Sequence, residues 1–247
     1  MYHLSAYTSS LVTGALTEIP ALSDDILRID NNRFVLPRDR DLVAFAAMSV
    51  DLQRVRIATP TTRQLANPWM RPFIDGAVPV DDPEVVDLSV RPIRLRGQEE
   101  VKVEALQDNA AAQRFTALLF ISDSLAPVPA GEPFKIRATS TGAAVANAWT
   151  TIDYTLEQQL PSGLYSVIGA EVIGANGQAF RLIFDDQFDR PGFLCSGDVN
   201  QRNNDMLQEY ALGEWGRFNT VTLPRLQVLA NAATASWEIY YELIKTA

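Results

Sequence analysis

The segment Leu160–Phe193 reads LPSGLYSVIGAEVIGANGQAFRLIFDDQFDRPGF and carries the clearest fold signal in the chain. Its first run, Tyr165–Ile173, is rich in β-branched and aromatic residues, which favour strands. Ala175–Gln178 supplies a turn, and Phe180–Phe184 forms the return run. The pair Arg190-Pro191 then ends the return strand, because proline cannot donate a hydrogen bond to a β-ladder. The segment therefore predicts a β-hairpin.

The same order of parts occurs earlier in the chain in a weaker form. Leu36-Pro37 precedes an apolar run at Leu42–Val50, which is followed by a short alternating run at Val55–Ala58. A second Arg-Pro pair, Arg71-Pro72, comes next. The Leu-Pro pairs are 124 residues apart (160 − 36), and the Arg-Pro pairs are 119 residues apart (190 − 71). This order predicts a second, equivalent hairpin.

The ends of the two halves give an independent comparison. Val103–Ile121 and Leu226–Ile244 align without a gap at an offset of 123 residues (226 − 103), and each reads as strand, alanine-rich tip and strand. The Ile-Asp pairs that begin at Ile29 and Ile152 have the same offset. These landmarks predict a tandem duplication, with two unrelated β domains or one large sandwich as the alternatives. A period of roughly 120 residues is too long for a solenoid or propeller blade and suits a whole β-sandwich.

The composition of the chain agrees with an all-β globular protein. Of its 247 residues 47% are hydrophobic and 21% charged, and fourteen prolines and thirteen glycines divide it into short segments. Three prolines and a glycine within Ser122–Pro133 indicate a linker. We expect an N-terminal arm at 1–25 with one short strand near Ser10–Leu16, a first β domain at 26–123, a linker at 124–133 and a second β domain at 134–247. One helix is expected at Asp198–Gly213.

The chain shows no targeting signal. The N-terminus lacks a basic region followed by an apolar run, so we expect no signal peptide, and no window approaches the ~18 apolar residues of a membrane span. The net charge of −9 argues against nucleic-acid binding by a broad basic face.

Two small β-sandwiches in tandem, joined by a proline-rich linker, resemble the double jelly-roll major capsid proteins of tailless icosahedral viruses, including membrane-containing bacterial viruses. The resemblance covers residues 26–246 and lies in architecture rather than in a diagnostic motif. It implies an all-β fold of two tandem jelly rolls, here with one short helix in the second, and trimers that form pseudo-hexameric capsomers. It also implies assembly in the host cytoplasm, a place in the virion, and no catalysis or cofactor. The partners it implies are further copies of the chain, neighbouring capsomers, other virion proteins or an internal membrane, without direct contact to nucleic acid.

Aromatic and arginine side chains near strand ends are of the types enriched at interface cores. The contact candidates of this kind are Trp69, Arg71, Phe188, Arg190 and Trp215. Each has a structural alternative: Trp215 can belong to the core, and the two arginines can bond to loop carbonyls.

Motifs for catalysis or metal binding are sparse. His3 is the only histidine and Cys195 the only cysteine, which argues against Ser-His-Asp, Cys-His and zinc sites. Asp185, Asp186 and Asp189 are calcium candidates, with a solvated acidic loop as the alternative. Two further functions stay open: a carbohydrate-binding or carbohydrate-active tandem β-sandwich, and a minor virion component with one jelly roll and an appended β domain.

Overall fold

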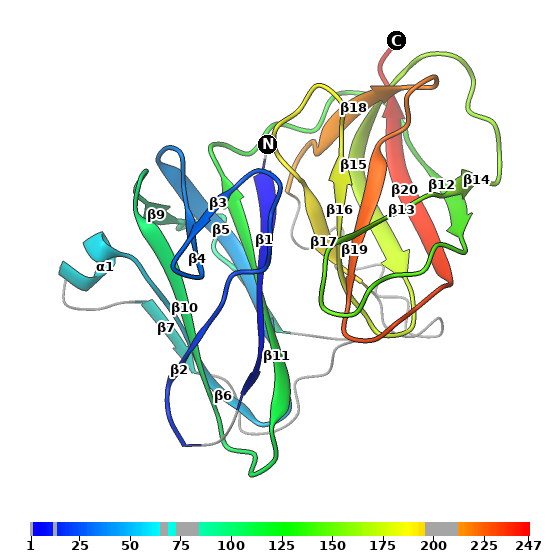
Figure 1. Ribbon diagram of the computed structural model, residues 1–247. Coiled ribbons are helices and arrows are strands. Elements are labelled where there is room, and N and C mark those ends of the chain that lie inside the picture. Colours follow the sequence, from blue (N-terminus) through cyan, green and yellow to red (C-terminus); the bar gives the residue numbers. More distant parts are fainter. Residues whose placement is uncertain (1, 12–13, 65–68, 73–83, 196–211) are drawn as a thin grey trace. The chain divides into compact units, whose positions relative to one another are not determined.

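The computed structural model describes residues 2–11, 14–64, 69–72, 84–195 and 212–247, and antiparallel strands dominate it (Figure 1). The chain divides into two compact units. The unit Ser5–Asp123 is called the first roll. The unit Ser124–Ala247, which also includes the chain up to Leu4, is called the second roll.

The first roll consists of two sheets. One has the strand order β1-β11-β5-β8 with β9 also paired to β5, and the other has the order β3-β4-β10-β6-β7 with β2 also paired to β10. The strands are β1 (Tyr2–Leu11), β2 (Thr17–Ile19), β3 (Arg28–Asp30), β4 (Arg33–Val35), β5 (Arg40–Met48), β6 (Leu52–Ala58), β7 (Trp69–Pro72), β8 (Glu84–Asp87), β9 (Ile93–Leu95), β10 (Glu100–Gln107) and β11 (Gln113–Ser122).

The second roll also consists of two sheets, with the orders β14-β12-β20-β15-β18 and β13-β19-β16-β17. The strands are β12 (Pro133–Ser140), β13 (Thr150–Ile152), β14 (Thr155–Leu156), β15 (Leu164–Ile173), β16 (Gly177–Ile183), β17 (Gly192–Leu194), β18 (Gly216–Asn219), β19 (Arg225–Ala230) and β20 (Trp237–Lys245).

Both rolls have the strand order of a jelly roll. When the strands are lettered B to I along the chain, each roll pairs them as B-I-D-G in one sheet and C-H-E-F in the other. The equivalent strands are β1 and β12 (B), β2–β4 and β13 (C), β5 and β15 (D), β6 and β16 (E), β7 and β17 (F), β8–β9 and β18 (G), β10 and β19 (H), and β11 and β20 (I). The predicted all-β fold with two tandem jelly rolls is confirmed.

The pairing register between the E and H strands also matches. Leu52 pairs with Gln107 in the first roll, and Gly177 pairs with Ala230 in the second. These pairs are related by offsets of 125 (177 − 52) and 123 (230 − 107). The sequence alignment of the last two strands therefore placed topologically equivalent strands on each other.

The two predicted β-hairpins are wrong, because the D and E strands of each roll (β5 and β6, β15 and β16) lie in different sheets and pair with other strands. The turn between the D and E strands is nevertheless equivalent in the two rolls. Asp51 and Asn176 have positive φ angles of 53° and 63°, a conformation that Asp and Asn adopt more readily than most residues. Each accepts a backbone hydrogen bond of 3.0 Å at its carbonyl oxygen, from Asp108 N in the first roll and Asn231 N in the second. One hydrogen bond thus ties the D–E turn to the H–I loop at the same place in each roll.

The core of the first roll lies between its two sheets. Val101, Val103 and Ala105 alternate with polar residues along β10 and are fully buried. They belong to one apolar cluster with Phe45 of β5 and Leu119 of β11, which lie in the other sheet. The inward face of β10 is therefore apolar, and its outward face carries the polar residues Glu100, Lys102 and Glu104.

The N-terminal region differs from the expected arm. Strand β1 covers Tyr2–Leu11 instead of the predicted Ser10–Leu16, pairs with β11, and supplies the B strand that the bounds 26–123 leave out. Its polar residues were misleading because they are buried: Thr8 Oγ1 donates to Phe115 O at 3.0 Å, whereas Ser5 is fully buried and its Oγ has no hydrogen-bond partner in the described part of the chain. A strand buried on both faces gives little alternation to detect.

The helix predictions also need revision. A short helix α1 (Pro60–Gln64), which the sequence did not predict, occurs in the first roll, and Thr59 Oγ1 caps it by accepting from Thr62 N at 3.3 Å. The predicted helix at Asp198–Gly213 lies outside the described residues except for its last two positions, which are not helical.

Candidate interaction surfaces

The loop between β16 and β17 presents one predicted contact residue and buries another. Phe188 is 84% exposed. Arg190 is only 8% exposed and donates from Nη1 to the carbonyl oxygens of Gln187 at 3.1 Å and of Phe188 and Asp189 at 3.3 Å. Phe188 is therefore presented to solvent by a loop that Arg190 holds from within, which is the structural alternative considered for this arginine.

Trp215 is a core residue rather than a surface contact. It is 2% exposed and packs edge-on against Tyr2 with ring centroids 5.8 Å apart. Phe180 lies on another side at 6.0 Å. The remaining candidates, Trp69 and Arg71, lie in β7, and their side chains are outside the described part of the chain.

The calcium candidates are not gathered into a site. Asp185 and Asp186 are exposed and line a pocket of about 320 Å³ that also includes Arg217, whereas Asp189 is buried. The described residues contain no group of three or more His, Cys, Asp or Glu residues that could hold a metal ion.

The side chains most capable of nucleophilic or general-base chemistry are not accessible. His3 and Cys195 are both buried, and burial raises the pKa of the Cys195 thiol. Neither is presented to a substrate. No helix in the described part of the chain is long and apolar enough to cross a membrane.

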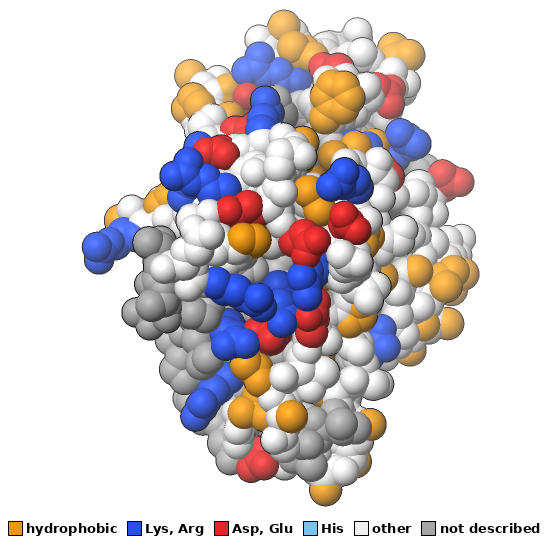
Figure 2. Space-filling view, turned by 60° about the vertical axis from the view of Figure 1, so that its left-hand side comes forward, with side chains coloured by type: hydrophobic (Ala, Val, Ile, Leu, Met, Phe, Trp, Pro, Cys, Tyr) orange, Lys and Arg blue, Asp and Glu red, His pale blue; other side chains and the backbone are white. Residues whose placement is uncertain are grey.

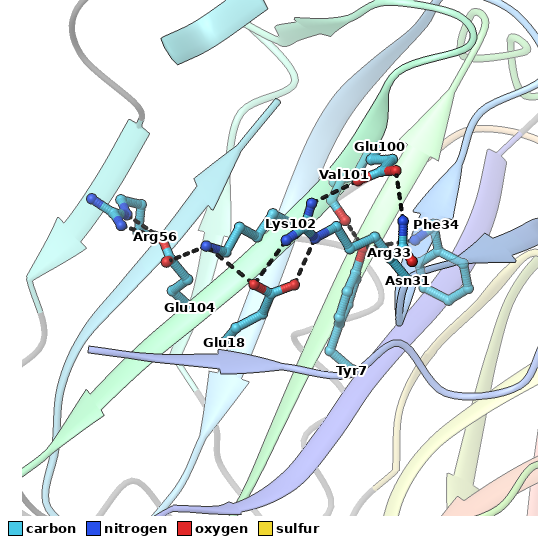
Figure 3. A network of polar contacts seen from close by, with 10 residues as sticks. All are labelled: Tyr7, Glu18, Asn31, Arg33, Phe34, Arg56, Glu100, Val101, Lys102 and Glu104. Carbon is cyan, nitrogen blue, oxygen red and sulfur yellow. Dashed lines mark hydrogen bonds and ion pairs between the residues drawn. The ribbon is translucent and has the colours of Figure 1, made fainter. Parts of the chain in front are cut away.

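A row of alternating charges crosses the outer face of the C-H-E-F sheet of the first roll (Figure 3). Glu100, Lys102 and Glu104 lie on this face because they alternate with the buried residues of β10. The row, which we call the ion-pair row, consists of Arg56, Glu104, Lys102, Glu18, Arg33 and Glu100. It brings strands β6, β10, β2 and β4 together and is electrically balanced, with three cations and three anions.

Lys102 is the central cation of the ion-pair row. Its Nζ lies 2.6 Å from Glu104 Oε1 and 3.1 Å from Glu18 Oε2. Glu104 and Glu18 are direct cross-strand partners, so their carboxylates would repel each other without this cation. Arg56 closes one end of the row by binding Glu104.

The other end of the ion-pair row is closed by Arg33. Its Nε lies 2.6 Å from Glu18 Oε1, and its Nη1 lies 2.6 Å from Glu100 Oε2. The Arg33 guanidinium holds the pKa of Glu18 below its ordinary value, against the opposing effect of burial and with help from Lys102. On the face shown in Figure 2, Lys and Arg side chains lie among Asp and Glu side chains rather than in a patch of one sign.

The loops at one end of the first roll are bonded to each other. Gln98, in the G–H loop, donates from its backbone N to Leu36 O at 2.8 Å and from Nε2 to Pro37 O at 2.9 Å. Gly97 N donates to Asp39 Oδ1 at 2.9 Å. A Cβ atom at Gly97 would lie 2.7 Å from the Cα atom of Arg38, so only glycine permits this approach. The C–D and G–H loops of the first roll are therefore closed against each other.

The equivalent loops of the second roll enclose a pocket of about 580 Å³. Position 98 corresponds to Val221 (221 − 98 = 123), which is 92% exposed and takes part in a turn closed by Asn219 Oδ1. The pocket is lined by Tyr154, Thr155, Leu156, Gln158, Gln159, Leu160, Ser162, Thr220, Val221 and Leu223. None of these residues is charged.

Comparisons with known proteins add little to this description. No protein-family model matches the chain, and no curated protein matches it. Among solved structures, the chain is similar to the major capsid protein P2 from Bacteriophage PM2, with 13% sequence identity over 100% of this chain and 98% of that chain, and a TM-score of 0.26. A TM-score this low does not establish a shared fold. The jelly-roll fold is identified from the strand order within each roll.

The sequence predicted neither the ion-pair row of the first roll nor the pocket of the second roll. The alternation of Glu100, Lys102 and Glu104 was visible, but their partners Glu18 and Arg33 come from a region interpreted as arm and short strands. The pocket joins two loops that lie more than fifty residues apart in the chain, between Ser162 and Thr220. The detectable signal was the Leu-Pro repeat, which marks the C–D loop in each roll.

Proposed function

We propose that this protein is a structural subunit of a viral shell, the major capsid protein, with three chains forming each capsomer. The observation that carries the proposal is the repetition of one jelly roll, strand for strand and with matching E–H register, within a single short chain. Three such chains supply six equivalent rolls, so a trimer can occupy a six-fold position in a lattice. Icosahedral shells require such positions, and closed symmetric rings supply them.

The surfaces of the two rolls support a structural role. The outer C-H-E-F face of the first roll is charged but balanced, which favours polar contacts between copies over binding of a polyanion. Phe188 is a large exposed apolar side chain of the kind that anchors interfaces. We assign Phe188 of the second roll, and Trp69 and Arg71 of the first, to contacts between chains, with residues 124–133 as the linker between the rolls.

In this proposal the protein acts in the virion, after assembly in the host cytoplasm, and performs no catalysis. Its partners are further copies of the chain, neighbouring capsomers and other virion components, which include an internal membrane where one is present. It does not contact nucleic acid directly, in keeping with its net charge of −9.

Native mass spectrometry of the purified protein over a range of concentrations tests the proposal. We expect a trimer as the smallest stable species, and we expect Phe188→Ser to shift the distribution toward smaller species while Val145→Ser, at another exposed apolar residue of the second roll, leaves it unchanged. A protein that stays monomeric at every concentration would contradict the proposal.

A further inference from the structure

The pocket between the C–D and G–H loops of the second roll is not demanded by the jelly-roll fold. The equivalent loops of the first roll are joined through Gln98 and Gly97. The equivalent loops of the second roll leave between them a volume of about 580 Å³, which lies within the ~300–1,000 Å³ typical of small-molecule sites. We propose that this pocket binds a neutral saccharide.

The walls of the pocket are fixed by two tyrosines. Tyr154 OH donates to Pro224 O at 2.6 Å, which anchors the G–H loop. Tyr165 OH donates to Pro161 O at 2.7 Å, which anchors the C–D loop to strand β15. Asn219 Oδ1 accepts from Val221 N at 2.8 Å and closes the G–H turn on itself. The backbone of both loops is therefore held in place before a ligand binds, which reduces the loop ordering that binding requires.

The lining offers neutral hydrogen-bonding groups in surplus. Gln158, Gln159 and Ser162 are exposed and have no hydrogen bond from their side chains to another described residue, as is true of Thr155 and Thr220. Amide and hydroxyl groups donate and accept, as the hydroxyl groups of a sugar do. These side chains are free to pair with a polyhydroxylated ligand.

The apolar part of the lining suits the other face of a sugar ring. Leu156, Leu160, Leu223 and Val221 line the pocket together with Tyr154. A pyranose carries C–H groups on its faces and hydroxyl groups at its rim, so it needs apolar contact and neutral hydrogen bonds side by side. Ligand sites of this size combine the same two elements.

The absence of charge in the lining selects against ionic ligands. In a chain with 21% charged residues, none of the ten lining residues is charged. A phosphate, carboxylate or amine bound here would lose its water without gaining a counter-charge, which is costly. The neighbouring pocket with Asp185, Asp186 and Arg217 shows the contrast, because it is charged.

Saturation-transfer difference NMR on the full-length purified protein tests the proposal. The probes are methyl glycosides of glucose, galactose, mannose and N-acetylglucosamine with their disaccharides, and N-acetylneuraminic acid and glucuronic acid serve as charged comparisons. We expect saturation transfer to at least one neutral probe and none to the acids. Transfer should not depend on calcium, because no carboxylate lines the pocket.

Variants locate the binding. Gln158→Ala combined with Gln159→Ala should weaken the affinity for the bound probe by about tenfold or more, since two hydrogen bonds are lost. Ser162→Trp should fill the pocket and abolish binding. The matched controls are Gln53→Ala in the first roll and Ser236→Ala in the H–I loop, which lie outside the pocket and should leave the affinity unchanged.

Two outcomes would overturn the proposal. One is no saturation transfer to any neutral probe from protein that is folded by circular dichroism. The other is binding that survives both the glutamine pair variant and Ser162→Trp. If amides of the C–D loop gain hydrogen-exchange protection only when copies associate, a segment of a second chain occupies the pocket instead. The proposed shell role is tested separately by the oligomeric state, which the glutamine variants should leave as in the wild type.

Discussion

Arg56 in the first roll and Arg181 in the second occupy the same place on the E strand, and each bonds to the residue opposite on the H strand. In the first roll that residue is Glu104, and the pair continues into the ion-pair row. In the second roll it is Gln227, whose Oε1 accepts from Arg181 Nε at 2.7 Å. The cross-strand contact of the arginine is thus kept, while its acidic partner Glu104 is replaced by the neutral Gln227.

The two arginines are also treated differently by their surroundings. Arg181 is 1% exposed, lies 4.4 Å from the centre of the Trp149 ring, and donates to Leu4 O at 3.4 Å within the second roll. An aromatic face and a carbonyl oxygen help to stabilise this buried cation. Arg56 is partly exposed and relies on Glu104. On the first roll the charged side chains are partly exposed and pair with each other. On the second roll the arginine is buried against the Trp149 ring.

The largest expected effect belongs to a residue found only in the second roll. Trp237 is fully buried, donates from Nε1 to Gly142 O at 3.0 Å, and packs so closely on the D–E turn that a Cβ at Gly174 would lie 2.3 Å from its ring. Trp237→Ala should lower the free energy of unfolding by about 4 kcal/mol. Native-state hydrogen exchange should show the loss at amides of β20. We expect Trp237 to stabilise the second roll alone, so a loss of equal size at amides of β11 in the first roll would contradict this prediction.

The next prediction tests whether the ion-pair row stabilises the first roll more than the equivalent positions stabilise the second roll. Lys102→Met removes the cation shared by Glu18 and Glu104, and we expect the first roll to lose about 2 kcal/mol of stability in urea unfolding. The matched variant is Arg225→Met, at the equivalent exposed position of the second roll (225 − 102 = 123), which should change stability by less than about 0.5 kcal/mol. Equal losses for the two variants would show that the ion-pair row contributes nothing specific.

The smallest effect is the pH dependence carried by Glu18. Because Arg33 lowers the pKa of Glu18 below its ordinary 4.5, the folded state favours the ionised carboxylate. Its contribution is complete above the pKa of the unfolded chain and is lost as the pH falls through the lower folded value. Glu18→Gln should therefore be less stable than the wild type at pH 7, and the difference should shrink below pH 4.5. A difference that does not vary with pH would show that Glu18 is not stabilised as an anion.

The sequence predicted most strands of the two rolls and missed one of the repeated strands, β1. The aligned ends at Val103–Ile121 and Leu226–Ile244 appear in the structure as equivalent strands, because alternating burial leaves a periodic pattern. The two runs of Tyr165–Phe184 also form strands, β15 and β16, but these strands lie in different sheets and do not pair with each other, so the predicted hairpin is wrong. Strand β1 was missed because its buried positions hold Ser, Thr and His, which are residue types more typical of exposed segments.

The candidate surfaces were less predictable than the fold for a physical reason. Phe188 was recognised from its type and its loop, and its exposure agrees with the surface position expected. Arg190 and Trp215 have the same residue types as interface anchors, yet tertiary packing buries them. The pocket depends on how closely two loops distant in sequence approach each other: Gly97 and Gln98 close them in the first roll, whereas the loops of the second roll line a pocket.

Electron microscopy of the purified protein tests most directly whether two equivalent rolls make this chain a shell subunit. We predict particles with a six-lobed outline, in which three copies each contribute two lobes, and hexagonal sheets or closed shells at high protein concentration. Particles with two lobes at every concentration, or rings whose lobe number is not a multiple of six, would contradict the account.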